Sequence, residues 1–272
     1  MQESSILHFF LRSLKYLNTT LFPFKKCCKK LFHQRYFNVD NKHCMMGSVD
    51  MAEDLHCNMG KNNTNSNNFY WIEYGIVFYP PKEFTEFCVN NFYSDGESSL
   101  KSKYFYGNFM HENTEYNFIR SLIKNSSKSV LIENQWVFST NNTKNRIIHD
   151  ILNKCVSNKN FQLILISNVN YVSSCHKKLP NNFFTKLNCS LNTYIFRYYF
   201  YQTLQYIYNY LKSRHMSTKD INKKIKIYVN SENMLVHSKN IIIDHDKMIY
   251  GTSNIWDRSF TKGNDIELSI FL

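Results

Sequence analysis

Four kinds of side chain that can act on a phosphate group fall within residues 234–267, near the carboxyl end of the chain. They are His237, Lys239, Asn254 and Glu267. An ammonium holds the non-bridging oxygens of a phosphodiester, and a histidine near neutral pH attacks phosphorus or protonates a leaving oxygen. The Asn254 amide would add a donor to the same oxygens. A carboxylate behind the imidazole would fix its tautomer, as in a Ser-His-Asp triad, and Glu267 is our candidate for that role.

The local pattern predicts how these side chains are positioned. Residues 235–243 alternate as in a strand, residues 244–247 are a polar turn, and residues 248–250 resume a short strand, so a hairpin is expected. Side chains two apart in a strand share a face, which would turn His237 and Lys239 the same way.

A His-x-Lys pair alone is more often a half-exposed strand edge than a site. The use of glycine favours a site here. The chain has only 7 glycines, and Gly251 and Gly263 both fall in this one stretch. Glycine is needed where the backbone must turn tightly or approach a ligand closely.

The pattern HxKxxxxD followed by GTSN resembles the HKD motif of the phospholipase D superfamily. Residues 228–271 resemble the carboxyl-terminal HKD segment of eukaryotic-type phospholipase D, and residues 131–136 (LIENQW) resemble a strand of the same branch. The resemblance implies that His237 is the nucleophile or general acid, that Lys239 and Asn254 bind phosphate, and that Glu267 orients the histidine.

The same resemblance brings in three further residues. Asp244 completes the motif, where it is more often a hydrogen-bond partner than a participant in the chemistry. Ser253 and Gln135 are predicted to contact substrate. Asn134 and Gln135 either line the mouth of the pocket or have a structural role in their strand. Trp256 stands where the family usually has Asn, which bears on substrate preference. No metal and no cofactor are implied.

Enzymes of this superfamily join two such motifs at one pocket, whereas this chain has one. It could form a homodimer that builds one site from two copies, it could be an inactive relic of a larger enzyme, or it could be a fragment. We favour the homodimer because every polar group of the local pocket is retained.

Three functions follow from this reading. The first is a phosphodiesterase that hydrolyses a glycerophospholipid to phosphatidic acid and a headgroup alcohol through a phosphohistidine. The alternatives are a single-motif endonuclease and a catalytically inactive, membrane-associated pseudoenzyme. The net charge of +12 and pI of about 9.2 suit an anionic partner, which includes both a phospholipid membrane and nucleic acid.

Two domains are expected: residues 1–68 as an amphipathic, basic segment with a flexible linker at 62–68, and residues 69–272 as the catalytic domain. Residues 6–22 have the pattern of an amphipathic helix, and residues 25–30 (KKCCKK) are basic. This segment either lies on a membrane surface or is an ordinary solvated helix. Eight irregularly spaced cysteines favour free thiols, so we expect a cytoplasmic protein. If the N-terminal segment lies on a membrane surface, the protein would be peripherally associated with that membrane.

The regular elements predict an α/β fold, with a mixed sheet flanked by helices, as in a single phospholipase D-like half. The expected helices are residues 115–124, 144–156 and 194–211, and the expected strands are residues 70–79, 130–138, 161–166, 225–229 and 266–271. The second helix would have one apolar side, and the aromatic residues of the third are expected in the core.

Overall fold

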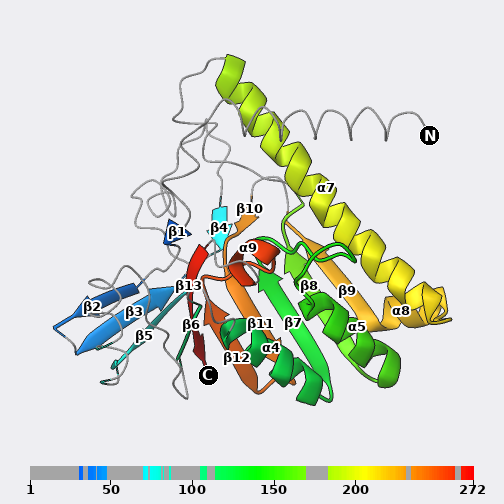
Figure 1. The fold of residues 1–272 in the computed structure, drawn as a ribbon, viewed down its shortest axis with the longest axis horizontal. Helices are drawn as coiled ribbons and strands as arrows, with labels where there is room; N and C mark the ends of the chain where they lie inside the picture. The colour runs from blue at the N-terminus through cyan, green and yellow to red at the C-terminus, as the bar shows by residue number, and fades with distance from the viewer. Residues whose placement is uncertain are drawn as a thin grey trace.

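The computed structural model confirms an α/β architecture (Figure 1). It describes residues 31–32, 36–40, 42–47, 70–72, 74–80, 82, 86, 105–108, 114–169, 183–230, 234–260 and 265–272. The helices are α4 (Thr114–Asn125), α5 (Ile147–Ser157), α7 (Phe183–Ser213), α8 (Thr218–Lys224) and α9 (Asp257–Phe260). The strands are β1 (Leu31–Phe32), β2 (Tyr36–Val39), β3 (His43–Gly47), β4 (Tyr70–Ile72), β5 (Gly75–Phe78), β6 (Phe105–Asn108), β7 (Ser129–Asn134), β8 (Gln162–Ser167), β9 (Ile225–Val229), β10 (Met234–Val236), β11 (Lys239–Ile243), β12 (Lys247–Gly251) and β13 (Asp265–Phe271).

Within the described residues, eight strands form the main sheet in the order β1-β13-β12-β11-β7-β8-β9, with β6 also paired to β13. Strands β7, β8 and β9 are parallel, whereas β11, β12 and β13 form antiparallel pairs. The sheet is therefore mixed. Its parallel strands are joined by the crossovers that contain α5 and α7–α8, as parallel pairing requires.

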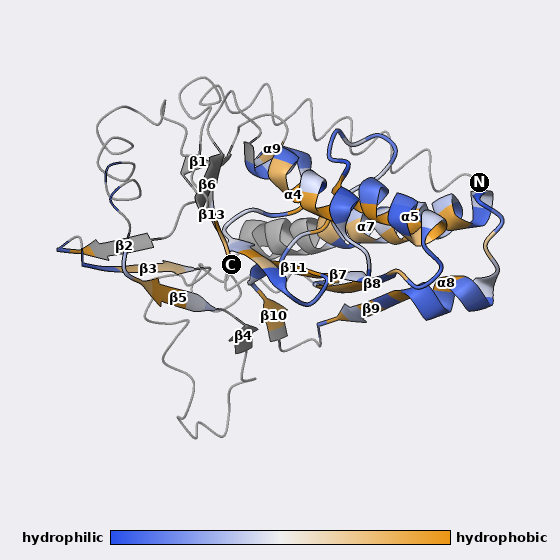
Figure 2. Cartoon of the chain, turned by 90° about the horizontal axis from the view of Figure 1, so that it is seen from below, coloured by the Kyte–Doolittle hydropathy of each residue, from blue (hydrophilic) through white to orange (hydrophobic). Residues whose placement is uncertain are grey.

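The core lies between the sheet and the helices α4, α5 and α7, which cover one of its faces (Figure 2). The predicted apolar side of α5 is confirmed, since Ile147, Ile148, Ile151, Leu152 and Cys155 are all buried. They pack in one cluster with alternate residues of β7, β8 and β11, because side chains two apart in a strand face the same way.

The long helix α7 departs from its prediction in two ways. It begins at Phe183, well before the expected residue 194. Its aromatic residues were expected in the core, and Phe200 and Tyr206 are buried there. However, Tyr194 and Tyr201 are about half exposed. The tyrosines run round the whole helix, so only one side of it can face the sheet.

The prediction of one strand over residues 70–79 is wrong. The chain forms β4 and β5 instead, and these belong to different sheets: β4 pairs with β10, and β5 pairs with β3. A continuous run of β-forming residues cannot reveal such a split, because partners far along the chain decide it.

The single strand expected over residues 235–243 is wrong in the same way. The segment divides into β10, which pairs with β4, and β11, which pairs with β7 and β12. His237 and Ser238 lie between the two strands. The hairpin of β11 and β12 is confirmed, with Ile243 opposite Lys247 across the turn.

The predicted amphipathic segment at residues 6–22, the basic run at 25–30 and the linker at 62–68 lie outside the described residues. The boundary at residue 68 stays a prediction. Strands from both sides of it share a sheet, since β3 pairs with β5.

Among the helices that the structure describes, none is both long enough and apolar enough to cross a membrane.

Candidate active site

Three strand ends meet at one edge of the main sheet, beside a fourth strand, β13. Lys239, the first residue of β11, lies opposite Asn134, the last residue of β7. Gly251, the last residue of β12, lies opposite Ser269 of β13. Residues just beyond these strand ends are therefore brought to the same edge, although they come from segments more than 100 positions apart in the sequence.

The predicted phosphate-binding residues lie at this edge and are buried. His237 is 4% exposed, and Lys239 and Asn254 are each 3% exposed. The Lys239 ammonium donates to the main-chain carbonyl of His237 at 2.6 Å. Asn254 Oδ1 is buried without a hydrogen-bond partner among the described residues. This oxygen is an acceptor, and leaving a buried acceptor unused is costly, so it suggests that a donor such as water binds there.

Asn134 holds the loop that carries Asn254. Its Nδ2 donates to the carbonyl of Ser253 at 3.0 Å, and its Oδ1 accepts from the N–H groups of Trp136 at 3.1 Å and Ile255 at 3.3 Å. One buried amide therefore fastens the end of β7 to the loop after β12. The asparagine of the LIENQW segment has a clear positional role.

The residues on either side of Asn134 contact the segment that carries His237. Ser238 donates its hydroxyl to the Glu133 carboxylate. The N–H of Gln135 donates to the carbonyl of Ser238 at 3.1 Å, and its own carbonyl accepts from Asn168 Nδ2 at 2.9 Å. These contacts use the Gln135 backbone, and a substrate contact by its side chain stays a prediction.

Glu267 is fully buried and accepts two hydroxyl hydrogen bonds. They come from Thr252 Oγ1 and Ser259 Oγ, each at 2.6 Å. The carboxylate thus joins β13 to the loop after β12 and to α9. Its predicted role behind the imidazole of His237 stays a prediction.

Glu115, in the first turn of α4, is a second buried carboxylate that the sequence did not single out. It accepts from Ser253 Oγ at 2.7 Å and from Ser269 Oγ at 2.5 Å. Burial raises the pKa of Glu115 to about 7, against the lowering effect of these two hydroxyls, and the charge of Glu267 raises it further. An acid in a first helical turn is ordinarily read as a partner of the helix dipole, so its spacing carried no signal.

These contacts define the carboxylate cluster, in which two acids from α4 and β13 hold four hydroxyls. Its members are Glu115, Glu267, Thr252, Ser253, Ser259 and Ser269.

Asp244 is not brought to this edge. It lies at the other end of β11, five strand residues or about 17 Å from Lys239. Its carboxylate accepts from the N–H groups of Ser127 and Lys128, both at 2.7 Å, and of Ser129 at 3.0 Å. Burial alone would raise the pKa of Asp244, but these N–H groups outweigh it and hold the pKa below its usual value. The contacts are those of a structural residue that fixes the start of β7.

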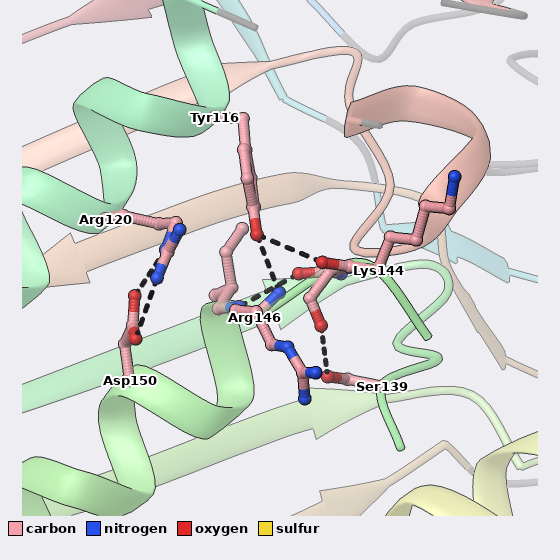
Figure 3. Close-up of polar contacts among 8 residues, drawn as sticks. Tyr116, Arg120, Ser139, Lys144, Arg146 and Asp150 are labelled. Atoms are coloured by element: carbon pink, nitrogen blue, oxygen red, sulfur yellow. Dashed lines mark hydrogen bonds and ion pairs between the residues drawn. The ribbon is translucent and has the colours of Figure 1, made fainter. Parts of the chain in front are cut away.

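A second polar cluster, the loop cluster, lies beside α4 and holds the loop before α5 (Figure 3). The Tyr116 hydroxyl accepts from the N–H of Arg146 at 2.8 Å and donates to the carbonyl of Lys144 at 3.3 Å. One turn further along α4, Arg120 Nε and Nη2 bind both oxygens of Asp150 at 2.5 and 3.2 Å. The loop cluster consists of Tyr116, Arg120, Lys144, Arg146 and Asp150.

No group of three or more His, Cys, Asp or Glu side chains in the described part of the chain is placed to hold a metal ion.

Comparison with known proteins gives a likeness of fold. No protein-family model matches the sequence, and no curated protein matches it. Among solved structures, phosphatidylserine synthase from Haemophilus influenzae Rd KW20 is similar with a TM-score of 0.56 at 12% identity, over 90% of this chain and 58% of the synthase. This chain therefore spans little more than half of that protein. At such identity the likeness concerns the fold alone.

Two more distant likenesses are looser. Polyphosphate kinase from Porphyromonas gingivalis has a TM-score of 0.48 at 6% identity, over 89% of this chain and 30% of the kinase. Nuc from Salmonella typhimurium, a phospholipase D family member, has a TM-score of 0.34 at 10% identity, over 61% of this chain and 80% of that one. Neither is close enough to support an argument about this protein.

Proposed function

We propose that this chain is a phosphodiesterase of the phospholipase D type that hydrolyses a glycerophospholipid to phosphatidic acid and a headgroup alcohol. The observation that carries the proposal is the convergence of strand ends at one sheet edge, where His237, Lys239 and Asn254 are all buried. The resemblance of residues 228–271 to the HKD segment supports the same chemistry.

The proposed reaction has two steps. An imidazole nitrogen of His237 attacks phosphorus, the bond from phosphorus to the headgroup oxygen breaks, and the leaving oxygen takes a proton to become the free alcohol. Water then attacks the phosphohistidine and gives a proton to the group that protonated the leaving alcohol. The phosphorus–nitrogen bond breaks, and phosphatidic acid is released. Lys239 and the Asn254 amide stabilise the charge on the non-bridging oxygens through both steps.

The proton for the leaving alcohol must come from a second acid. We propose that a second copy of the chain supplies it through its own His237, in a homodimer with a twofold axis at the site. Because the site residues are 3–4% exposed, a phosphodiester reaches them only if the surrounding chain opens. Gel filtration with light scattering distinguishes the dimer from a monomer.

The test is release of headgroup from phosphatidylcholine vesicles by purified protein. We expect His237→Ala to lower turnover by about 10³-fold or more, as removal of a nucleophile does. His245→Asn is the matched control. It removes an exposed imidazole, 3.2 Å from Ser129 Oγ, at a position with φ of 72° that asparagine tolerates. Equal activity in His237→Ala and the wild type would contradict the proposal.

The net charge of +12 also suits cleavage of nucleic acid, which is the second candidate. A single-stranded DNA substrate is therefore assayed beside the lipid. Cleavage of DNA without headgroup release would identify a nuclease. The absence of turnover on both substrates would favour the inactive protein.

A further inference from the structure

An aromatic recess lies between the end of the β7 segment, α7 and α9. It has a volume of about 280 Å³ and is lined mainly by Phe138, Ile195, Phe196, Tyr199, Trp256 and Arg258. Phe196 stacks on Phe138 and on Trp136, with ring centroids 5.7 and 4.1 Å apart. The Trp256 ring lies tilted beside Phe138, with centroids 6.0 Å apart.

The recess is joined to the candidate site through the backbone. Trp256 follows Asn254 by two residues, and its N–H donates to the Asn254 carbonyl at 2.9 Å. Between them, Ile255 pairs with Val137 in a bridge, with the N–H of Phe138 donating to the Ile255 carbonyl at 2.8 Å. The loop that presents Asn254 at the sheet edge therefore continues directly into the wall of the recess.

The polar groups of the lining are used by the protein itself. The Asp257 carboxylate accepts from the N–H groups of Lys144 at 3.0 Å and Asn145 at 2.7 Å. Thr143 Oγ1 donates to the Thr140 carbonyl at 2.9 Å. The remaining surface is overwhelmingly apolar. A nucleobase would lose hydrogen bonds to water along its polar edge, whereas a hydrocarbon chain has none to lose.

The rim has the composition of a water–lipid boundary. Tyr199 on α7 is 47% exposed, and the Arg258 guanidinium lies 5.7 Å from the centre of the Trp256 ring. Tyrosine and arginine keep an apolar body in hydrocarbon and a polar end in water. The α7 sequence, residues 183–213, contains no acidic residue that would repel an anionic lipid surface.

We propose that this recess holds an acyl chain of the glycerophospholipid whose phosphodiester lies at the Asn254 end, with Trp256 as a residue that sets substrate preference. The inference rests on the proposed function and deepens it. It explains why an aromatic side chain stands at position 256, where the superfamily pattern usually has asparagine. Bound chain length is then recognised by buried methylenes, each of which tightens binding about fourfold until the recess is full.

The test measures chain binding independently of turnover. Lysophosphatidylcholine with bromine on its acyl chain is titrated below its micelle-forming concentration, and quenching of tryptophan fluorescence is followed. Trp256 lies in the wall of the recess, so we expect saturable quenching. Glycerophosphocholine with no chain should not compete, and unlabelled lysophosphatidylcholine should.

Two substitutions on α7 form a matched pair. Ile195→Arg puts a charge into the recess and should weaken chain binding by at least about tenfold. Tyr201→Arg adds the same charge on the same helix at a side chain that is 53% exposed and does not line the recess, so it should bind as the wild type does. Loss of quenching in Trp256→Phe would confirm that Trp256 is the reporter.

The outcomes separate this inference from the proposed function. Absence of quenching, or equal quenching in Ile195→Arg and Tyr201→Arg, overturns the acyl site even if headgroup is released. Quenching by 5-bromouridine 5′-monophosphate, with none by the brominated lipid, also overturns it and indicates base stacking. Saturable quenching that only Ile195→Arg removes supports the acyl site, even if the headgroup assay shows no turnover.

Discussion

Glu115 and Tyr116 are neighbours in the first turn of α4, yet they belong to two polar clusters of different construction. In the loop cluster, an anion meets a cation, since Arg120 binds both oxygens of Asp150, and Tyr116 binds backbone groups (Figure 3). In the carboxylate cluster, Glu115 and Glu267 are each held by two hydroxyls.

The two clusters differ in how the negative charge of a carboxylate is stabilised. A guanidinium neutralises a carboxylate at any ordinary pH, whereas a hydroxyl only donates a hydrogen bond to it. The pKa of Glu115 is raised to about 7 by burial, and the Glu267 charge contributes. The loop cluster therefore keeps its contacts at any ordinary pH. The carboxylate cluster, which holds Thr252 and Ser253 beside Asn254, responds to protons in the neutral range.

The largest effect is expected from breaking the carboxylate cluster at Glu267. Glu267→Ala leaves the hydroxyls of Thr252 and Ser259 without their acceptor and opens a cavity at a fully buried position, which together cost about 3–5 kcal/mol. Urea unfolding at pH 7 measures this loss. Asp246→Ala, which removes a carboxylate that is 67% exposed, serves as the control with little expected change. A loss below about 1 kcal/mol in Glu267→Ala would show that the cluster contributes little.

A smaller effect, with a defined pH dependence, is expected at Glu115. Its folded-state pKa of about 7 lies above the ordinary value of 4.5, so the folded protein binds the extra proton between these values. The free energy of unfolding therefore falls as the pH rises from 4.5 through 7, by about 3 kcal/mol in total for this group. Glu115→Gln, which cannot ionise, should abolish that part of the pH dependence and be the more stable protein at pH 8.

Unfolding curves of the wild type and Glu115→Gln at pH 5, 6, 7 and 8 test this expectation. Parallel pH dependence in the two proteins would mean that Glu115 titrates normally. Headgroup release over the same pH range shows whether the proton also affects the loop that carries Asn254.

The smallest effect is expected in the loop cluster. Tyr116→Phe removes the acceptor of the Arg146 N–H and the donor to the Lys144 carbonyl, while Arg120 and Asp150 stay paired. The half-exposed loop can turn these groups to water, so we expect a loss of about 1 kcal/mol and no change in its pH dependence. Chemical denaturation at pH 6 and 8 checks both statements. A pH-dependent loss of stability would contradict them and show that the loop cluster is coupled to the carboxylate cluster.

The fold could be predicted largely from local pattern. The apolar side of α5 and the hairpin of β11 and β12 follow from periodicity and turn composition, because burial of one face imposes that periodicity. The two strand predictions that were wrong, for residues 70–79 and 235–243, have the same cause. Their first halves, β4 and β10, pair with each other in a small separate sheet.

The candidate site was predictable in part. Its residue types and spacing singled out His237, Lys239, Asn254 and Glu267, and the resemblance added Ser253, Gln135 and Asp244. The contacts then separated Asp244, at the far end of β11, from the rest. They also added Glu115 and gave Asn134 a structural role, through partners that lie 138 and 119 positions away. Hydrogen bonds between residues so far apart in the chain cannot be predicted from local spacing.

The amino-acid sequence by itself determined the kinds of side chain available near the carboxyl end and the alternation of helices and strands, since both depend on residues close together in the chain. Only the tertiary structure decided which groups face one another at the sheet edge. Strand register and the packing of α4 and α7 bring distant segments within hydrogen-bonding reach, and those contacts determine which acid is structural, which one titrates near neutral pH, and where an apolar recess forms.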